Sequence, residues 1–388
     1  MASIQFSPMT SIFNNMAAGT VIFGSPGSGK SFYLLNIIAN ALIMEQKIFA
    51  LDPKDDLGVI SDIFPSVEYI NINDIIPGSL NPFKVLKDID TNTLTSIISI
   101  ICGGLTDDQN TAISPILNDF VNKYKREKKV TGTSNVSFSD VTNYLYANDN
   151  DAARTVGNKL NTHRDSRYGA LLFDDGEDYT EEEIKSQFDD NSKIISLHGM
   201  NLPKSETKNL TEEQKFNSGI VFIICKMLRD ILTKGNYPTL FIMDEAHIAL
   251  RNPSFSEIVD DFLVLGRSLN IATILATQNA THVPASIAQL IASKFCFKSS
   301  TKEAKAFLEN FYNADKNNMA DFDSISFQIG EFETGNCFYI DSKNRSGFFK
   351  VTSLFGSDVT SNPLMKKAKP KKSSNMIKKN KNENKNII

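Results

Sequence analysis

A short stretch near the amino end of the chain is spaced like a loop that binds phosphate. Gly24, Gly29, Lys30 and Ser31 fill the pattern G-x-x-x-x-G-K-[ST]. Backbone N–H groups curl around an anion where glycines accept unusual φ/ψ angles, and a following helix adds its unpaired amides and positive dipole end. Lys30 would reach the β- and γ-phosphates of a nucleotide, and the Ser31 hydroxyl would ligate Mg²⁺. The predicted nucleotide-binding residues are Gly24, Ser25, Pro26, Gly27, Ser28, Gly29, Lys30, Ser31 and Phe32.

The segments on either side of this loop favour a phosphate site over a surface turn rich in glycine and serine. Residues 20–23 are Thr-Val-Ile-Phe, which is typical of a buried strand that runs into the loop. Residues 32–44 are apolar at helical spacing and contain no proline. Strand, loop and helix is the arrangement that the motif requires.

A second group of candidate residues follows the apolar strand predicted over 239–243. Asp244 and Glu245 come directly after it. An aspartate at this position holds Mg²⁺ through water in nucleotide-hydrolysing proteins, and Glu245 is placed to act as general base toward the attacking water. The alternative is a helix start or a surface acidic cluster. His247 either relays the nucleotide state or packs at the start of a helix.

Two further positions are candidates for contact with the transferred phosphoryl group. Gln278 closes the strand predicted over 272–277, and its neutral amide can hydrogen-bond both the γ-phosphate and the lytic water. Capping of the strand end is the alternative for Gln278. Arg267 precedes that strand and suits the charge that builds up in phosphoryl transfer, in the same chain or from a neighbouring subunit. Arg251 competes for this role, and surface salt bridging is the alternative for both arginines.

Composition sets broad limits on the class of protein. The chain has 388 residues, of which 41% are hydrophobic and 22% charged, as in ordinary globular proteins. We expect no transmembrane segment and no secretory signal, because no apolar run approaches roughly 20 residues and residues 1–14 lack a cationic region. The four cysteines, Cys102, Cys225, Cys296 and Cys337, show no CxxC spacing, and a cytoplasmic protein with reduced thiols is expected.

Charge is distributed unevenly along the chain. The net charge is −4, but residues 365–388 hold nine lysines and one glutamate, which leaves 32 basic and 44 acidic residues before them. A body this acidic is not typical of a general nucleic-acid coat. The tail over 351–388 is predicted to be a disordered, solvated extension, and contact with a nucleic acid or an anionic membrane is the alternative.

The order of predicted elements favours an α/β protein with a doubly wound, mainly parallel sheet. Short strands at 47–52, 67–72 and 193–197 alternate with helices, one of them at 217–234. Helices predicted at 94–101, 113–124, 138–146 and 152–160 interrupt this pattern. We therefore expect a sheet domain over 1–90 and 168–350, with a mainly helical insertion over 91–167. Residues 327–332 and 337–341 are predicted to form a closing hairpin, and residues 174–190 an acidic loop or short helix.

Together these motifs resemble the ATPase domain of VirB-four-type (TraC/TraE/CagE-like) proteins of type IV secretion and conjugation, in the HerA/FtsK branch of RecA-like ATPases. The resemblance spans most of residues 17–350. It depends on one ordered set of segments: Gly24 to Phe32, Leu80-Asn81-Pro82-Phe83, Tyr168 to Asp174, Ile194 to Gly199, Leu240 to His247, and Ala276-Thr277-Gln278-Asn279. The Asn-Pro-Phe and Ala-Thr-Gln segments are more particular to the family than the phosphate loop.

The resemblance implies an ATP- and Mg²⁺-dependent ATPase, often hexameric, that is cytoplasmic and peripheral to the inner membrane, where it contacts secretion-channel proteins. Lys30, Ser31, Asp244, Glu245 and Gln278 match the catalytic positions of the family, and Arg267 matches its arginine approximately. The short segment before the loop favours an alternative, a motor that translocates DNA or packages a genome, with substrate loops within 125–135 and 204–215. A third hypothesis is an assembly factor that binds ATP and hardly hydrolyses it.

Overall fold

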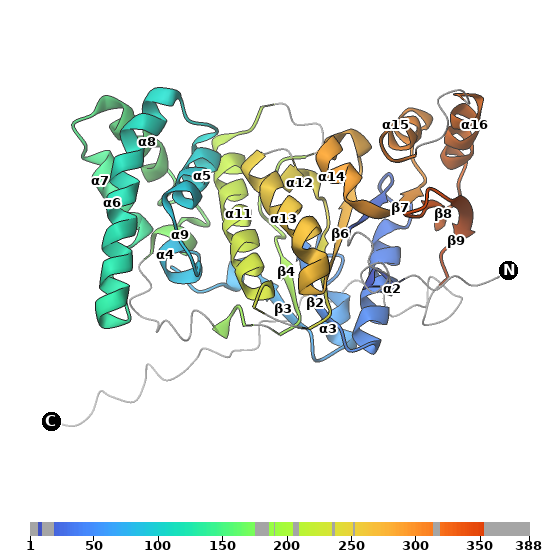
Figure 1. Ribbon diagram of the computed structural model, residues 1–388, viewed down its shortest axis with the longest axis horizontal. Coiled ribbons are helices and arrows are strands. Elements are labelled where there is room, and N and C mark those ends of the chain that lie inside the picture. The colour runs from blue at the N-terminus through green and yellow to red at the C-terminus, as the bar shows by residue number, and fades with distance from the viewer. Residues whose placement is uncertain are drawn as a thin grey trace.

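The computed structural model describes residues 7–9, 19–174, 186–189, 191–204, 209–234, 237–250, 253–312 and 319–352. Figure 1 shows an elongated molecule with a sheet in its middle and helices at both ends. The strands are β1 (Gly19–Phe23), β2 (Lys47–Asp52), β3 (Glu68–Asn71), β4 (Lys193–Ser196), β5 (Thr239–Met243), β6 (Ile271–Thr277), β7 (Ile291–Phe297), β8 (Asn336–Ile340) and β9 (Ser346–Lys350). The longer helices are α2 (Lys30–Ile43), α5 (Thr91–Cys102), α6 (Asp107–Thr131), α7 (Phe138–Tyr146), α8 (Asp151–Asn161), α11 (Glu212–Leu232), α13 (Pro253–Leu269), α15 (Thr301–Phe311) and α16 (Met319–Gly330). Short helices are α3 (Val59–Ile63), α4 (Pro82–Val85), α9 (Gly169–Phe173), α12 (His247–Leu250) and α14 (Ala285–Gln289).

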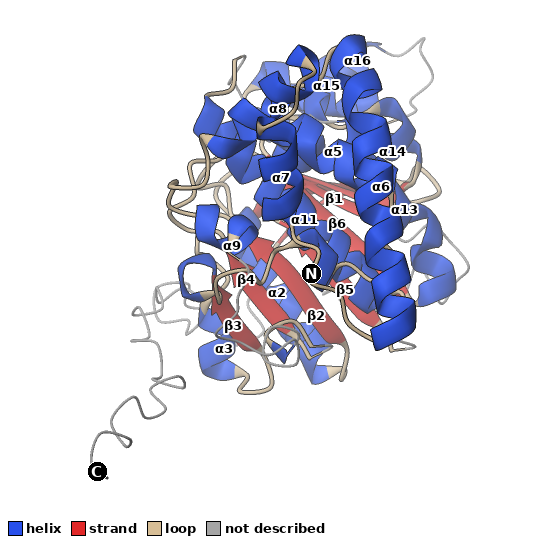
Figure 2. Cartoon of the chain, turned by 90° about the vertical axis from the view of Figure 1, so that its left-hand side faces the viewer, coloured by secondary structure: helices blue, strands red, loops and turns tan. Residues whose placement is uncertain are grey.

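The strands form one twisted sheet in the order β3-β4-β2-β5-β6-β1-β7-β8-β9 (Figure 2). Pairing is parallel from β3 through β7, and the last two strands join in antiparallel register. Because parallel strands end at the same edge, the loops that follow β2, β5, β6 and β1 are neighbours in that order. The predicted fold class, a doubly wound and mainly parallel sheet, is confirmed.

Alternating side chains place a separate apolar core on each face of the sheet. On one face, Val21, Phe49 and Phe241 pack with α5, α11 and α13. On the other, Ile22 and Ile48 pack with α2 and α3. Successive side chains on a strand point to opposite faces, so a strand that is buried on both sides reads as a continuous apolar run. That is why residues 239–243 and 271–277 stand out in the sequence.

Four helices, α5 to α8, lie between β3 and β4 in the chain and at one end of the molecule (Figure 1). Their starts are capped locally: the Asp90 side chain accepts the Thr93 amide, and Thr106 and Gln109 form a capping box at the start of α6. Helix α5 packs on α11, which connects this group to the sheet. The helices predicted within 91–167 are present. That this group forms an insertion with boundaries at 91 and 167 stays a prediction.

One predicted element is wrong. Residues 327–330 are the last turn of α16, and the closing hairpin pairs β8 with β9, from Asn336↔Lys350 to Ile340↔Ser346. Other predictions fall outside the described residues: Arg251, the tail from 353 onward, most of the stretch 174–190, and residues 205–208 of the predicted substrate loop within 204–215. Within the part of the chain that is described, no helix is both long and apolar enough to cross a membrane.

Candidate nucleotide site

The predicted phosphate loop connects β1 to α2, as the motif requires. Gly24, Gly27 and Gly29 have φ angles of 154°, 75° and 107°, in a region that side chains with a Cβ disfavour. A Cβ on Gly24 would lie 2.7 Å from Phe297 Cβ, and one on Gly29 would lie 3.0 Å from the Gly335 amide nitrogen. Gly29 is the N-cap of α2 and offers no side chain to its first amides. This helix start therefore keeps its N–H groups available for an anion.

Neighbouring elements hold the loop in place. The Ser25 amide donates to the carbonyl of Lys298, just after β7 (2.9 Å), and the Gly335 amide donates to the carbonyl of Ser28 (3.0 Å). The Thr334 hydroxyl donates to the Gly27 carbonyl at 3.3 Å. Behind the loop, Tyr33 packs its ring against three phenylalanines of β7 and β9, Phe295, Phe297 and Phe349. The β7–β8–β9 edge thus supports the loop and its helix together.

Lys30 lies inside the loop that it follows. Its ammonium donates to the carbonyls of Gly24 and of Ser25, the latter at 3.1 Å. Burial lowers the pKa of Lys30 to about 8, and the positive charge of Lys54 acts in the same direction. Asp244 and Glu245 act in the opposite direction, so the three predicted catalytic groups sense one another's charge. Lys30 belongs to the loop after β1 and Asp244 follows β5, so both lie at the carboxyl edge of the parallel strands.

The acidic pair follows β5 on a tightly held turn. Asp244 is 3% exposed, its amide donates to the Leu51 carbonyl on β2 (3.2 Å), and its Oδ1 accepts the Glu245 amide (3.0 Å). Its other oxygen, Oδ2, has no hydrogen-bond partner among the described residues. Burial raises the pKa of Asp244 to about 6, against the opposing charge of Lys54. On the apolar side, a small cavity lined by Leu51, Val221 and Ile248 reaches both acids.

Three side chains converge on the carboxylate of Glu245. Its Oε1 accepts a hydrogen bond from Gln278 Nε2 (2.5 Å) and an ion pair from Lys54 Nζ. Its Oε2 lies 3.1 Å from Nδ1 of His247, whose Nε2 is 3.1 Å from the Pro203 carbonyl. Burial alone would raise the pKa of Glu245, but the contacts with His247 and Lys54 hold it at about 2. Glu245 is therefore an ion in this arrangement and a weak base.

A turn after β2, residues 52–57, joins the phosphate loop to the acidic pair. The buried Asp52 accepts the amides of Lys54 (3.2 Å) and Leu57 (2.7 Å), which fixes the turn from within. From this turn Asp56 accepts the hydroxyl of Ser31 at 3.1 Å, and Lys54 reaches Glu245. Burial would lower the pKa of Lys54, but Asp244 and Glu245 raise it above its ordinary value. The turn thus contacts the predicted metal ligand and the predicted base at once.

The sequence profile of the AAA-like domain family matches residues 12–361. The chain belongs to the AAA-like domain family. No curated protein sequence matches it. Among solved structures it is similar to VirB4 of Thermoanaerobacter pseudethanolicus, with a TM-score of 0.65 and 15% identity over 86% of this chain and 89% of that one. It is also similar to the bacterial conjugative coupling protein TrwBdeltaN70 in an unbound form, with a TM-score of 0.57 and 13% identity over 86% of this chain and 84% of that one.

At these identities the structural likeness shows a shared fold. With the family match, it confirms the resemblance drawn from the sequence motifs and makes this AAA-like chain a P-loop NTPase domain. The residues fit a nucleotide with a divalent cation. In the part of the chain that the structure describes, the buried oxygens Ser28 Oγ and Asp244 Oδ2 lack hydrogen-bond partners, and the start of α2 has no side-chain cap. Hydroxyl and carboxylate oxygens are the ligands that Mg²⁺ prefers.

The structure brings together most, but not all, of the predicted site residues of this AAA-like domain. Lys30, Asp244, Glu245 and Gln278 meet at the carboxyl ends of β1, β5 and β6. Arg267 does not join them: it is exposed on the last turn of α13, close to Asn270, whose carbonyl accepts the amide of the first residue of β5 (2.9 Å). It therefore lies toward the amino ends of the strands, at the opposite edge of the sheet.

Lys54 is a site residue that the sequence motifs missed. A usable signal was present, because Pro53 and Lys54 follow the strand at 47–52 directly. In a doubly wound sheet the carboxyl ends of the parallel strands face the ligand, so a charged residue just after any such strand is a candidate.

Proposed function

We propose that this AAA-like chain hydrolyses ATP to ADP and phosphate in a Mg²⁺-dependent reaction and works as an oligomeric motor. One observation carries the proposal: four neighbouring parallel strands, in the order β2-β5-β6-β1, deliver Lys54, the pair Asp244 and Glu245, Gln278, and the glycine loop with Lys30 to one edge of the sheet. Carboxylate, amide and ammonium groups gathered beside an anion cradle are the groups that phosphoryl transfer to water requires.

Each group has a role that its chemistry supports. The loop amides and Lys30 would hold the phosphates, and Ser31 and Asp244 would hold the metal, whose charge stabilises the transferring phosphoryl group when it is bound. Glu245 would accept a proton from the attacking water, and Gln278, already hydrogen-bonded to Glu245, would orient that water. The position of Asp56 supports Ser31, because a hydroxyl that donates its proton to a carboxylate keeps its lone pairs free for a cation.

Two substitutions test the hydrolysis itself. Lys30→Ala removes the cation from the loop and is expected to abolish both nucleotide binding and turnover. Glu245→Gln keeps the shape of the side chain and removes its basicity, so it is expected to bind Mg-ATP and lose turnover by about 10²–10⁴-fold. Phosphate release and equilibrium nucleotide binding, measured on both variants, check these outcomes. Normal hydrolysis by Glu245→Gln would show that another group is the base.

The cellular role that fits best is a motor of conjugation or type IV secretion, because the solved structures with this fold include VirB4 and a conjugative coupling protein. The partners we infer are further copies of the chain, as a hexamer, and channel proteins at the inner face of the membrane. Cargo would be protein, pilin or DNA. Co-purification with membrane channel components, without stimulation of turnover by DNA, supports the secretion role.

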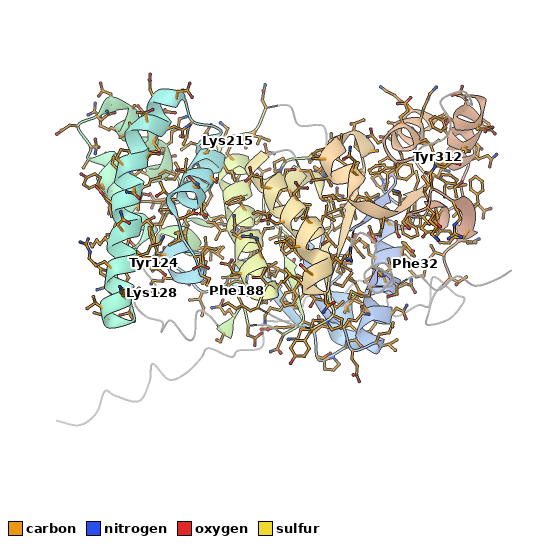
Figure 3. The ribbon with its side chains drawn as sticks, in the orientation of Figure 1. Phe32, Tyr124, Lys128, Phe188, Lys215 and Tyr312 are labelled. Carbon is orange, nitrogen blue, oxygen red and sulfur yellow. The ribbon has the colours of Figure 1, made fainter. Side chains whose placement is uncertain are left out.

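A DNA-translocating or genome-packaging motor is the second candidate, and one surface favours it. The carboxyl-terminal half of α6 carries Lys123, Lys125, Arg126 and Lys129 exposed to solvent, on a chain whose body is otherwise acidic. Figure 3 shows Tyr124 and Lys128 of this segment at one end of the molecule, with Phe32 of α2 toward the other. A cationic helix end suits the phosphate backbone of a nucleic acid. This role would be supported if DNA stimulated ATP turnover and if that stimulation decreased as the salt concentration rose.

A further inference from the structure

Glu245 is weakened as a base in the arrangement described here. Lys54 and Gln278 both contact its Oε1, and His247 faces its Oε2. A carboxylate whose oxygens face an ammonium, an amide N–H and an imidazole is a poor acceptor for the proton of a water molecule. Loss of the Lys54 ion pair from Oε1 would make Glu245 a stronger base toward water.

Of the three partners, Lys54 is the one that can leave. His247 is 4% exposed at its side chain, and its other ring nitrogen contacts the Pro203 carbonyl. Gln278 extends directly from the end of β6 and is partly buried. The Lys54 side chain is 38% exposed and has a four-carbon arm, whereas Asp52 fixes the backbone of its turn. Its ammonium can therefore move without disturbing the fold around it.

The destination of Lys54 follows from its charge and its surroundings. Its ammonium interacts electrostatically with Lys30, the residue placed to contact the phosphates. A triphosphate in the loop would add several negative charges close to Lys30 and Lys54, which in its absence are balanced by Asp244 and Glu245 and, for Lys54, also by Asp56. We propose that Lys54 exchanges the Glu245 carboxylate for the γ-phosphate of bound nucleotide, so that Glu245 is released only when a triphosphate fills the loop.

This inference rests on the proposed ATPase function and adds a sensor to it. A diphosphate has no γ-phosphate, so the pair between Lys54 and Glu245 stays closed in the ADP-bound form. Lys54 thereby gives the site preference for ATP over ADP and couples that preference to release of the base. The same side chain that weakens Glu245 as a base without substrate contacts substrate when it is present.

Nucleotide discrimination tests the exchange without requiring turnover. Mg-ADP and the non-hydrolysable Mg-β,γ-imido analogue of ATP are titrated by calorimetry into the full chain. Lys54→Met is expected to lower the affinity for the ATP analogue by about tenfold and to leave the affinity for ADP unchanged. The reason is that one charge-assisted contact is lost, and it is made to the γ-phosphate alone. Lys54→Arg keeps the charge and is expected to retain the preference. Lys87→Met, on an exposed lysine beside α4, is the matched control and is expected to bind both nucleotides like the parent chain.

A double-mutant cycle tests whether the Glu245 carboxylate and the γ-phosphate compete for the ammonium of Lys54. Glu245→Gln is expected to raise the affinity for the ATP analogue, because Lys54 then has no ion pair with residue 245 to break before it contacts the γ-phosphate. In the Lys54→Met background the same change is expected to have no effect. The proposed exchange would be overturned if the two substitutions changed the binding free energy of the analogue additively, or if Lys54→Met lowered the affinities for ADP and the analogue equally. Either result would leave the ATPase proposal intact. If the parent chain bound neither nucleotide, both the proposed exchange and the proposed ATPase function would be wrong.

Discussion

Glu245 has a backbone conformation that few residues other than glycine adopt, with a φ of 52°. The turn is enforced from both sides: the Ala246 amide donates to the Ala276 carbonyl on β6 (2.8 Å), and the Ile248 amide donates to the Glu245 carbonyl (3.0 Å). A left-handed residue other than glycine costs on the order of 1 kcal/mol and persists where the surroundings dictate it. Here it aims the carboxylate at Gln278 and Lys54. Strain is thus located at the group proposed to act on water.

Asp52 connects the site to stability and yields a pH prediction. Burial raises the pKa of Asp52 to about 7, although the Leu57 amide partly opposes this. Its folded-state pKa lies above its unfolded value, so the stability that it supports is complete below about pH 4 and is lost as pH rises through 7. We expect the melting temperature to fall between pH 5 and pH 8, and to fall less in Asp52→Asn, by about a few degrees.

Thermal unfolding of both proteins at pH 5 and pH 8, in chelator and without nucleotide, measures this difference. Asp244, whose charge helps to raise the pKa of Asp52, is present in both proteins, so the difference reports Asp52 together with its interaction with Asp244. Equal pH dependence in parent and variant would mean that Asp52 is ionised throughout this range.

The sequence predicted those site residues that a known motif or a strand end marks. Lys30, Asp244, Glu245 and Gln278 were found because apolar runs located the strands and a polar residue followed each one. Lys54 was missed because its role depends on strand order: β2 lies next to β5 in the sheet although the two are far apart in the chain. The position of Arg267 could have been predicted, because a residue just before the parallel strand at 271–277 lies at the amino edge of the sheet, opposite the loop.

At the scale of elements, helices with local caps and strands buried on both sides were predicted well. The error at residues 327–332 has a physical cause. Phe327, Ile329 and their neighbours alternate like a strand over a short window, but the buried positions Ser326 and Ile329 continue a helical spacing from the partly buried Phe322. Phe327 is 63% exposed on the outer side of α16. A window of six residues is too short to distinguish the two-residue alternation of a strand from the 3.6-residue repeat of a helix.

The exposed charge on α6 gives a prediction for that element. Reversing Lys125, Arg126 and Lys129 to glutamate removes cations from a surface far from the nucleotide loop (Figure 3). If the chain moves DNA along this surface, stimulation of turnover by DNA should weaken, and each lost phosphate contact should lower the salt slope of binding by about 0.9. Basal turnover should stay unchanged.

Lys87, Lys302 and Lys343 are also exposed, and their reversal to glutamate is a control of equal charge change. Both triple variants and the parent are compared by DNA titration at several salt concentrations. If the salt dependence of DNA binding had the same slope in all three proteins, α6 would not contact DNA, and the secretion role would be favoured.

At the scale of the whole molecule, the two edges of the sheet carry different candidate residues. The candidate nucleotide site lies at the carboxyl ends of the strands, and Arg267 lies near the amino ends. An arginine at the opposite edge cannot serve the loop of its own chain without a large rearrangement. It can serve a neighbouring copy, because a head-to-tail ring places one edge of a subunit against another face of the next. The exposed Val264 and Leu265, on the same helix, are suited to such a contact.

Mixing two inactive variants tests whether Arg267 acts between subunits. Arg267→Ala is expected to bind nucleotide and turn it over about 10³-fold more slowly or worse, because phosphoryl transfer loses its arginine. Lys30→Ala binds no nucleotide but still presents Arg267. In rings assembled from equal amounts of both, about a quarter of the interfaces pair an intact loop with an intact arginine, so turnover should recover in that proportion. Sedimentation must first show that the parent chain forms an oligomer in Mg-nucleotide. Mixtures as inactive as either variant alone would place Arg267 outside the reaction, and full activity in a monomer would remove the need for a neighbouring subunit.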